Sequence, residues 1–296
     1  MKKGDVAVIG AGPAGVAAAM QLARYEARPF VYEMYRPGGL VRNARLVENY
    51  PGFPRGIGGP ELGALLAGSL ERSEADVSIE EVTGLDFAGG VYRVSSERGE
   101  ADYRAVIVAT GTEPVPLEGS GIDREAERAI LYEIESVRDV SGRSIAVIGA
   151  GDAAFDYALT LARNNDVVIV GRSARASCNA SLARSAAESE RITVLLSASV
   201  GRISAAEGGK SRLEISLGGC AGETTMVADH VIAAVGRSPR AGFISDKIMN
   251  DLDVLFGAGT LHLAGDVRGG RRRQTAIAAG DGVLAAMEIY ESIGLD

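Results

Sequence analysis

Two short glycine-rich segments hold the residues with the clearest chemistry. The first, DVAVIGAGPAG, spans residues 5–15, and the second, SIAVIGAGDAA, spans residues 144–154. In a G-x-G-x-x-G/A pattern, bare backbone can turn tightly and approach a pyrophosphate. A helix that begins at such a turn offers unpaired N–H groups and a partial positive charge to the phosphates. We therefore predict two dinucleotide sites, formed by Gly10, Gly12, Pro13, Ala14 and Gly15, and by Gly149, Gly151, Asp152 and Ala153.

One residue after each glycine turn indicates which nucleotide is bound. Glu33 lies 23 residues after Gly10, where a carboxylate accepts hydrogen bonds from an adenosine ribose. Arg172 lies 23 residues after Gly149, and a guanidinium there attracts a 2′-phosphate. The second site is therefore expected to prefer NADPH over NADH, with help from Arg175. A solvated surface arginine is the alternative interpretation of Arg172.

The elements that would position these residues repeat along the chain. Each glycine turn follows a β-branched apolar run and precedes an Ala/Leu-rich stretch, VAAAMQLAR or FDYALTLAR. Each half closes with a similar strand, VIVATGTEP at 106–114 or VIAAVGRSP at 231–239. We predict an α/β fold with two Rossmann-like, three-layer domains, one inserted in the other. The boundaries are 1–114 with 238–296 for the first domain and 115–237 for the second, and a helix is expected at 275–293.

The amino-acid composition argues against several classes of function. The net charge of −8 disfavours binding to nucleic acid or anionic membranes. No apolar run approaches the ~20 residues of a membrane span, and the first residues lack the apolar core of a signal peptide, so we expect a soluble, cytoplasmic protein. The two cysteines, Cys178 and Cys220, and the two histidines, His230 and His262, do not form a metal-site pattern.

An ordered series of motifs resembles the thioredoxin reductase-like, two-dinucleotide-binding flavoproteins. The series is GAGPAG with Glu33, PGGL (37–40), VENYPGFP (47–54), ATG (109–111), GAGDAA (149–154), VGRSP (235–239), AGD (264–266) and RQTA (273–276). The resemblance implies FAD at the first glycine turn and NADPH, or NADH, at the second. It also implies a homodimer.

The resemblance implies roles for matching residues. Glu33 would bind the FAD ribose, Asn49 would lie near the flavin ring, and Asp266 would bind the ribityl and pyrophosphate region. Gln274 and the neighbouring backbone N–H groups would face the pyrimidine edge of the flavin, where donors stabilise the negative charge of reduced flavin. The other implied contacts are Gly39, Leu40, Thr110, Gly111, Gly265, Arg273 and Thr275 for FAD, and Gly236 for the nicotinamide dinucleotide.

The chain departs from this family where a redox dithiol would be. The family spacing places a Cys-x-x-Cys pair near Tyr132 and Glu135, and that stretch contains no cysteine. Cys178 and Cys220 are not at motif spacing, and we interpret each as a small apolar residue. Only Arg172 matches the family's arginine run, while Arg175 approximates a later arginine. The chain also ends soon after its last predicted helix, which leaves little length for a lid over the flavin.

These observations predict an FAD-dependent NAD(P)H oxidoreductase without a thiol relay and without a catalytic side chain. Its acceptor would be a small redox protein or a small molecule. One alternative is a ferredoxin–NADP reductase-like enzyme, in which Arg271, Arg272 and Arg273 dock an acidic carrier. A second is a non-catalytic FAD-binding protein with a degenerate second site. Thioredoxin reduction through the two distant cysteines is the remaining alternative.

Overall fold

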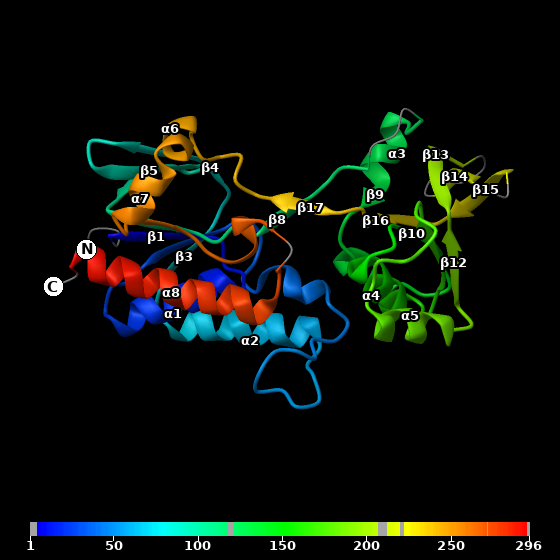
Figure 1. Ribbon diagram of the computed structural model, residues 1–296, viewed down its shortest axis with the longest axis horizontal. Coiled ribbons are helices and arrows are strands. Elements are labelled where there is room, and N and C mark those ends of the chain that lie inside the picture. Colours follow the sequence, from blue (N-terminus) through cyan, green and yellow to red (C-terminus); the bar gives the residue numbers. More distant parts are fainter. Residues whose placement is uncertain (1–4, 118–120, 207–211, 220–221, 271, 295–296) are drawn as a thin grey trace. The chain divides into compact units, whose positions relative to one another are not determined.

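The computed structural model describes residues 5–117, 121–206, 212–219, 222–270 and 272–294 (Figure 1). The chain divides into two compact units by its internal contacts. The first contains residues 1–42, 46–113 and 238–296, and the second contains 43–45 and 114–237. The chain passes from one unit to the other mainly at two places. Each place lies in one of two short strands that pair with each other, β8 (Thr112–Pro114) and β17 (Arg237–Pro239).

The first unit is built on a five-stranded parallel sheet with the order β18-β7-β1-β2-β3. Successive residues of the central strand enter opposite cores, because Val6 and Val8 pack towards the long helices while Ala7 and Ile9 pack on the other face. The strands are β1 (Val6–Ile9), β2 (Phe30–Glu33), β3 (Asp76–Ile79), β7 (Ala105–Val108) and β18 (Leu261–Leu263).

Helices and a small antiparallel sheet form the outer layers of this unit. The helices of the first face are α1 (Pro13–Arg24), α2 (Gly59–Arg72) and α8 (Thr275–Ile293). The other face carries β4 (Val82–Ala88), β5 (Val91–Ser96), β6 (Gly99–Tyr103), α6 (Asp246–Asn250) and α7 (Leu252–Gly257). The short turn helices are η1 (Gly39–Asn43) and η3 (Gly265–Arg268). The predicted helix at 275–293 is confirmed, whereas the sequence analysis did not predict α6, α7 or the antiparallel sheet.

The second unit repeats this plan around a parallel sheet with the order β12-β11-β10-β16-β9. Its strands are β9 (Ile130–Leu131), β10 (Ser144–Ile148), β11 (Asp166–Gly171), β12 (Ile192–Leu196) and β16 (His230–Ala233). One face packs on α4 (Asp152–Leu161) and α5 (Ala180–Ala187). The other packs on α3 (Arg124–Ala129), β13 (Ala198–Ala205), β14 (Leu213–Gly219) and β15 (Gly222–Ala228), and η2 (Glu135–Val137) follows β9. The two parallel sheets confirm the predicted α/β fold class.

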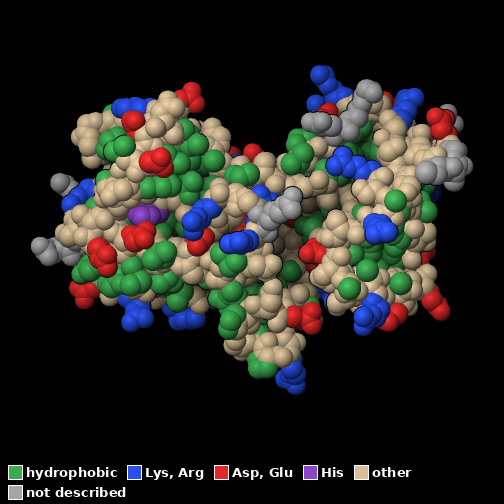
Figure 2. All heavy atoms as spheres, in the orientation of Figure 1, with side chains coloured by type: hydrophobic (Ala, Val, Ile, Leu, Met, Phe, Trp, Pro, Cys, Tyr) green, Lys and Arg blue, Asp and Glu red, His purple; other side chains and the backbone are tan. Residues whose placement is uncertain are grey.

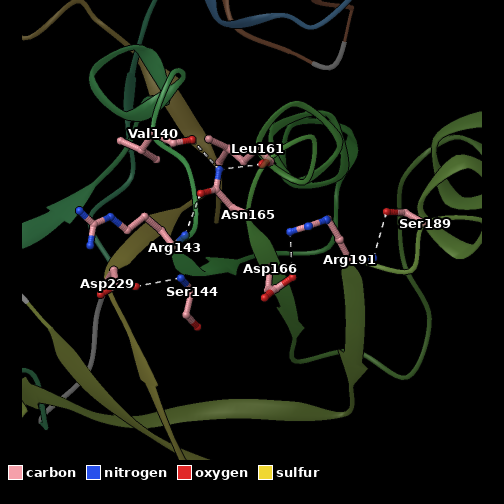
Figure 3. Close-up of polar contacts among 9 residues, drawn as sticks. All are labelled: Val140, Arg143, Ser144, Leu161, Asn165, Asp166, Ser189, Arg191 and Asp229. Carbon is pink, nitrogen blue, oxygen red and sulfur yellow. Dashed lines mark hydrogen bonds and ion pairs between the residues drawn. The ribbon is translucent and has the colours of Figure 1, made fainter.

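Side chains fasten the amino-terminal edge of the second parallel sheet (Figure 3). Asn165 is 1% exposed, and its Nδ2 donates to the carbonyl oxygens of Val140 and Leu161 at 2.9 and 2.8 Å. Its Oδ1 accepts the N–H of Arg143 at 3.0 Å. This edge is the opposite end of β10 from the glycine turn, so these contacts fix the scaffold rather than a ligand.

Among the described residues, no helix is both long and apolar enough to cross a bilayer, and no cluster of three or more potential metal ligands occurs. On the face of each unit shown in Figure 2, acidic and basic side chains are interspersed.

Candidate dinucleotide sites

The first glycine turn lies where the carboxyl end of β1 meets the residues after β7. Gly10 has φ 102°, and a Cβ there would lie 2.4 Å from the carbonyl oxygen of Ala109. A Cβ on Gly15 would lie 1.8 Å from the carbonyl oxygen of Gly10. The turn therefore closes only because both positions carry glycine.

The amino-terminal end of α1 is open to a ligand. Gly12 is the N-cap residue, in extended conformation, and no side chain caps it. Pro13 is the first helical residue and has no N–H, so the first available donors belong to the following residues. Bare backbone N–H groups with the positive end of the helix dipole suit a diphosphate.

Glu33 is held at the end of β2 by contacts that the sequence does not reveal. The residue is 9% exposed. Its Oε2 accepts the N–H of Ala11 at 2.8 Å, and its Oε1 accepts the N–H of Tyr35 at 3.0 Å. Because Ala11 lies inside the glycine turn, the carboxylate is fixed beside the predicted phosphate position. The two oxygens keep further lone pairs for ribose hydroxyls.

Other predicted first-site residues gather at the same sheet edge because they follow parallel strands. Gly111 (φ 66°) follows β7, and Gly265 (φ 76°) follows β18. A Cβ on Gly265 would lie 3.0 Å from the Cβ of Ala14, which places this turn against the start of α1. The hydroxyl of Thr110 donates to the carbonyl oxygen of Arg240 at 2.6 Å.

Two predicted flavin contacts meet although 225 residues separate them. The amide Nδ2 of Asn49 donates to Oε1 of Gln274 at 2.6 Å. Gln274 is the N-cap of α8, so Thr275 begins that helix, and Asp266 lies in η3. Gly39 lies against Gly12, with its hypothetical Cβ 2.8 Å from the Gly12 Cα, while Leu40 is 40% exposed.

The second glycine turn has a similar backbone geometry. Gly149 has φ 134°, and a Cβ there would lie 2.3 Å from the carbonyl oxygen of Ala234, in the residues after β16. Gly151 is the N-cap of α4, is extended, and has no side-chain cap. Asp152 and Ala153 form the exposed first turn of α4, and Gly236 has φ 139°. This end of α4 is therefore a second candidate diphosphate site.

The loop after β11 carries the two predicted phosphate ligands. Arg172 follows the strand directly, and both Arg172 and Arg175 are exposed. Within the described part of the chain, neither makes an ion pair. The loop returns to the glycine turn, where the N–H of Ser177 donates to the carbonyl oxygen of Ala150 at 2.8 Å. Both guanidinium groups are thus available to an anionic ligand.

The region where the family resemblance would place two cysteines holds a carboxylate instead. Oε1 of Glu133 pairs with Nη1 of Arg237 at 2.5 Å, and its Oε2 accepts from the hydroxyl of Tyr157 at 3.1 Å. Burial, followed by the charge of Glu133, raises the pKa of Tyr157, so this hydroxyl stays protonated. Sequence reasoning did not identify Glu133, because its partners lie 24 and 104 residues away.

Cys178 is partly buried, and its environment does not favour a thiolate. Burial raises the pKa of the thiol, and the charge of Asp152 raises it further. Cys220 and Arg271 lie outside the described residues.

Two parallel sheets, each with an uncapped glycine turn after its central strand, define a protein with two Rossmann-like dinucleotide-binding units. A family model described as pyridine nucleotide-disulphide oxidoreductase matches residues 4–280, and the chain belongs to this family of oxidoreductases.

Thioredoxin reductases are among the proteins most similar to the chain. It is 32% identical over 299 residues to the bifunctional thioredoxin reductase/thioredoxin of Mycobacterium leprae, covering 96% of this chain but only 64% of that protein. It is 27% identical to the thioredoxin reductase of Neurospora crassa, covering 96% and 91% of the two chains. The thioredoxin reductase of Lactococcus lactis has a matching fold, with a TM-score of 0.86 and 29% identity over 99% of both chains.

Proposed function

We propose that this chain binds FAD in its first unit and NADPH in its second, and that it passes electrons to an external acceptor without a redox dithiol. The main support is the pair of glycine turns, which have similar backbone geometry and side chains of opposite charge beside them. A carboxylate follows the first turn at Glu33, and a guanidinium follows the second at Arg172. The family generally uses FAD and NADPH, and the uncapped helix ends at both turns suit the diphosphate that the two cofactors share.

In the first unit, the chain's own residues would bind and orient FAD. The open end of α1 at Gly12 would hold the diphosphate, and Glu33 would accept hydrogen bonds from the ribose. Asn49 and Gln274, already hydrogen-bonded to each other, would lie at the flavin ring. When bound, the flavin supplies the hydride-accepting chemistry, so the chain needs to contribute alignment and electrostatics rather than an acid or base.

In the second unit, Gly151 would hold the diphosphate of NADPH, and Arg172 would pair with the 2′-phosphate, with Arg175 beside it. NADH would lack that charged contact and bind less tightly. Electrons would pass directly from the flavin to a small redox protein or a small molecule, which is supported by the absence of cysteine at 132 and 135.

Anaerobic titration with NADPH tests the electron path. The purified protein should be yellow, and its flavin absorption band should bleach on addition of NADPH. A colourless preparation that does not take up FAD would refute the proposal at its first step. A second assay adds thioredoxin or an aromatic disulfide as the acceptor. Turnover that disappears in Cys178→Ser or Cys220→Ser would refute the dithiol-free path.

We further propose that the FAD domain comprises 1–114 and 238–296, that the NADPH domain comprises 115–237, and that two copies form a homodimer. The mass of the protein in solution, measured by light scattering, tests the homodimer. Separate expression of 115–237 with NADPH titration tests the domain assignment.

A further inference from the structure

The guanidinium of Arg42 joins two backbone segments beside the first glycine turn. Its Nε and Nη2 donate to the carbonyl oxygen of Pro37 at 3.1 and 2.7 Å. Its Nη2 also donates to the carbonyl oxygen of Gly63 at 3.0 Å. Pro37 lies in the loop after β2, and Gly63 lies within α2. One planar cation therefore ties this loop to a rigid helix.

Two glycines make room for the Arg42 side chain. A Cβ on Gly63 would lie 2.5 Å from the Cγ of Arg42, closer than two carbon atoms can pack. A Cβ on Gly38, which has φ 110°, would lie 2.6 Å from the carbonyl oxygen of Gly63 and 2.8 Å from Nε of Arg42. The clamp therefore depends on the absence of side chains at both positions.

The clamped loop lies directly on the predicted phosphate turn. The N–H of Gly38 donates to the carbonyl oxygen of Ala11 at 2.8 Å. Gly39 follows with φ 65°, and its hypothetical Cβ would lie 2.8 Å from the Cα of Gly12. Movement of the loop would therefore shift the backbone that surrounds the N-cap of α1.

The second unit holds its corresponding loop by different chemistry. Ser177 donates to Ala150 over the same separation of 27 residues as Gly38 to Ala11, so the two loops correspond. The second loop is then anchored by Asp152, whose Oδ1 accepts the N–H of Asn179 at 2.7 Å. Asp152 is the first residue of α4.

The first unit cannot use that anchor. The residue that corresponds to Asp152 is Pro13, which has no side-chain acceptor. Arg42 holds the loop of the first unit instead, through backbone carbonyl groups. It thereby holds the loop without placing a carboxylate at the helix end that is to receive phosphate.

We propose that Arg42 is a positioning residue for the first dinucleotide site, which it preorganises by fixing the loop at 37–39 over the glycine turn. The inference rests on the proposed function of the first unit as the FAD site. Arg42 donates to the loop and to α2, and we expect its effect to be on the affinity for FAD. Because the bonds it makes are charge-assisted, their loss should raise the Kd for FAD by about tenfold to a hundredfold.

The test measures FAD binding to the apoprotein by flavin fluorescence for four proteins. Arg42→Ala removes the guanidinium, and Gly63→Ala leaves Arg42 intact but occupies the space of its Cγ. The double variant has no Cγ at position 42, so the methyl group added at position 63 no longer meets that atom. The matched control is Arg72→Ala, because Arg72 is an exposed residue of α2 whose nearest described polar contact is Ser69 in its own helix.

Both single variants should bind FAD more weakly, and the double variant should resemble Arg42→Ala rather than combine the two losses. Limited proteolysis of the apoprotein should cut within 36–42 faster in the single variants than in Arg72→Ala. Additive losses, or a Kd unchanged in Arg42→Ala, would overturn the positioning role while leaving FAD binding intact. A wild-type apoprotein that binds no FAD would instead overturn the proposed function itself.

Discussion

Replacing Gly282 by alanine should destabilise the first unit, although alanine favours helices. Gly282 is buried in α8, where this helix crosses α1. An added Cβ would lie 2.0 Å from the carbonyl oxygen of Ala14 and 2.8 Å from its carbonyl carbon. Ordinary contact begins near 3.4 Å, so the two helices would have to separate locally by about 1.4 Å.

The magnitude follows from two opposing terms. An alanine in a helix interior gains about 1 kcal/mol over glycine. Forcing a methyl group into a packed backbone contact costs about 1–3 kcal/mol, and a clash with backbone lies at the upper end. We therefore expect the free energy of unfolding to fall by about 2 kcal/mol.

Gly280→Ala is the matched control, because Gly280 lies in the same helix and a Cβ there would meet nothing within 4 Å. This variant should gain up to about 1 kcal/mol. Urea titration followed by circular dichroism measures both variants. Equal stabilisation by the two substitutions would refute the close packing of α8 on α1. Because Ala14 belongs to the first turn of α1, Gly282→Ala should also weaken FAD binding, and Gly280→Ala should not.

Three further outcomes are expected. Asn165→Ala should lower the free energy of unfolding by about 2–4 kcal/mol in urea titrations, because it removes the three hydrogen bonds that this buried side chain makes to backbone groups of Val140, Arg143 and Leu161. Asn164→Ala at the exposed neighbour should change it by less than about 0.5 kcal/mol. Burial lowers the pKa of His262 in the folded protein, so below the ordinary value near 6.5 the unfolded chain takes up the proton first and the folded state loses stability. Thermal melts between about pH 7 and 5 should therefore show a smaller decrease in melting temperature for His262→Gln than for the wild type. Arg172→Glu should raise the Kd for NADPH at least about tenfold in calorimetry while changing the Kd for NADH much less; equal changes would remove Arg172 from the 2′-phosphate site.

Local patterns in the sequence were sufficient for the framework of both sites. A β-branched run, a glycine turn and an Ala/Leu-rich stretch each report on neighbouring residues, so the strands and helices around Gly10 and Gly149 could be predicted. The positions of Glu33 and Arg172 follow from the same spacing. All of these features depend on separations of a few tens of residues within one strand–turn–helix–strand unit.

Contacts that join distant segments could not be predicted in this way. Asn49 meets Gln274 across 225 residues, and Glu133 meets Arg237 across 104. The antiparallel sheet of β4, β5 and β6 was missed because an irregularity interrupts β4 between Val82 and Gly84 and because β6 is mostly polar, and α6 and α7 were missed because they have only five and six residues. Such features are set by packing rather than by local periodicity.

The two candidate sites have similar backbones but different charged side chains. Both turns present an open helix end, so under the proposed function the backbone alone would give affinity for a diphosphate and little discrimination between dinucleotides. Discrimination between the dinucleotides must then come from charged side chains beside the glycine turns. These differ at two pairs of corresponding positions, Pro13 with Asp152 and Glu33 with Arg172. Pro13 leaves the first helix end without a charge, whereas Asp152 places a carboxylate at the second. Under the proposed function, the second site would need Arg172 and Arg175 to restore an electrostatic field that attracts phosphate, and we expect its affinity to depend on salt more strongly than that of the first site.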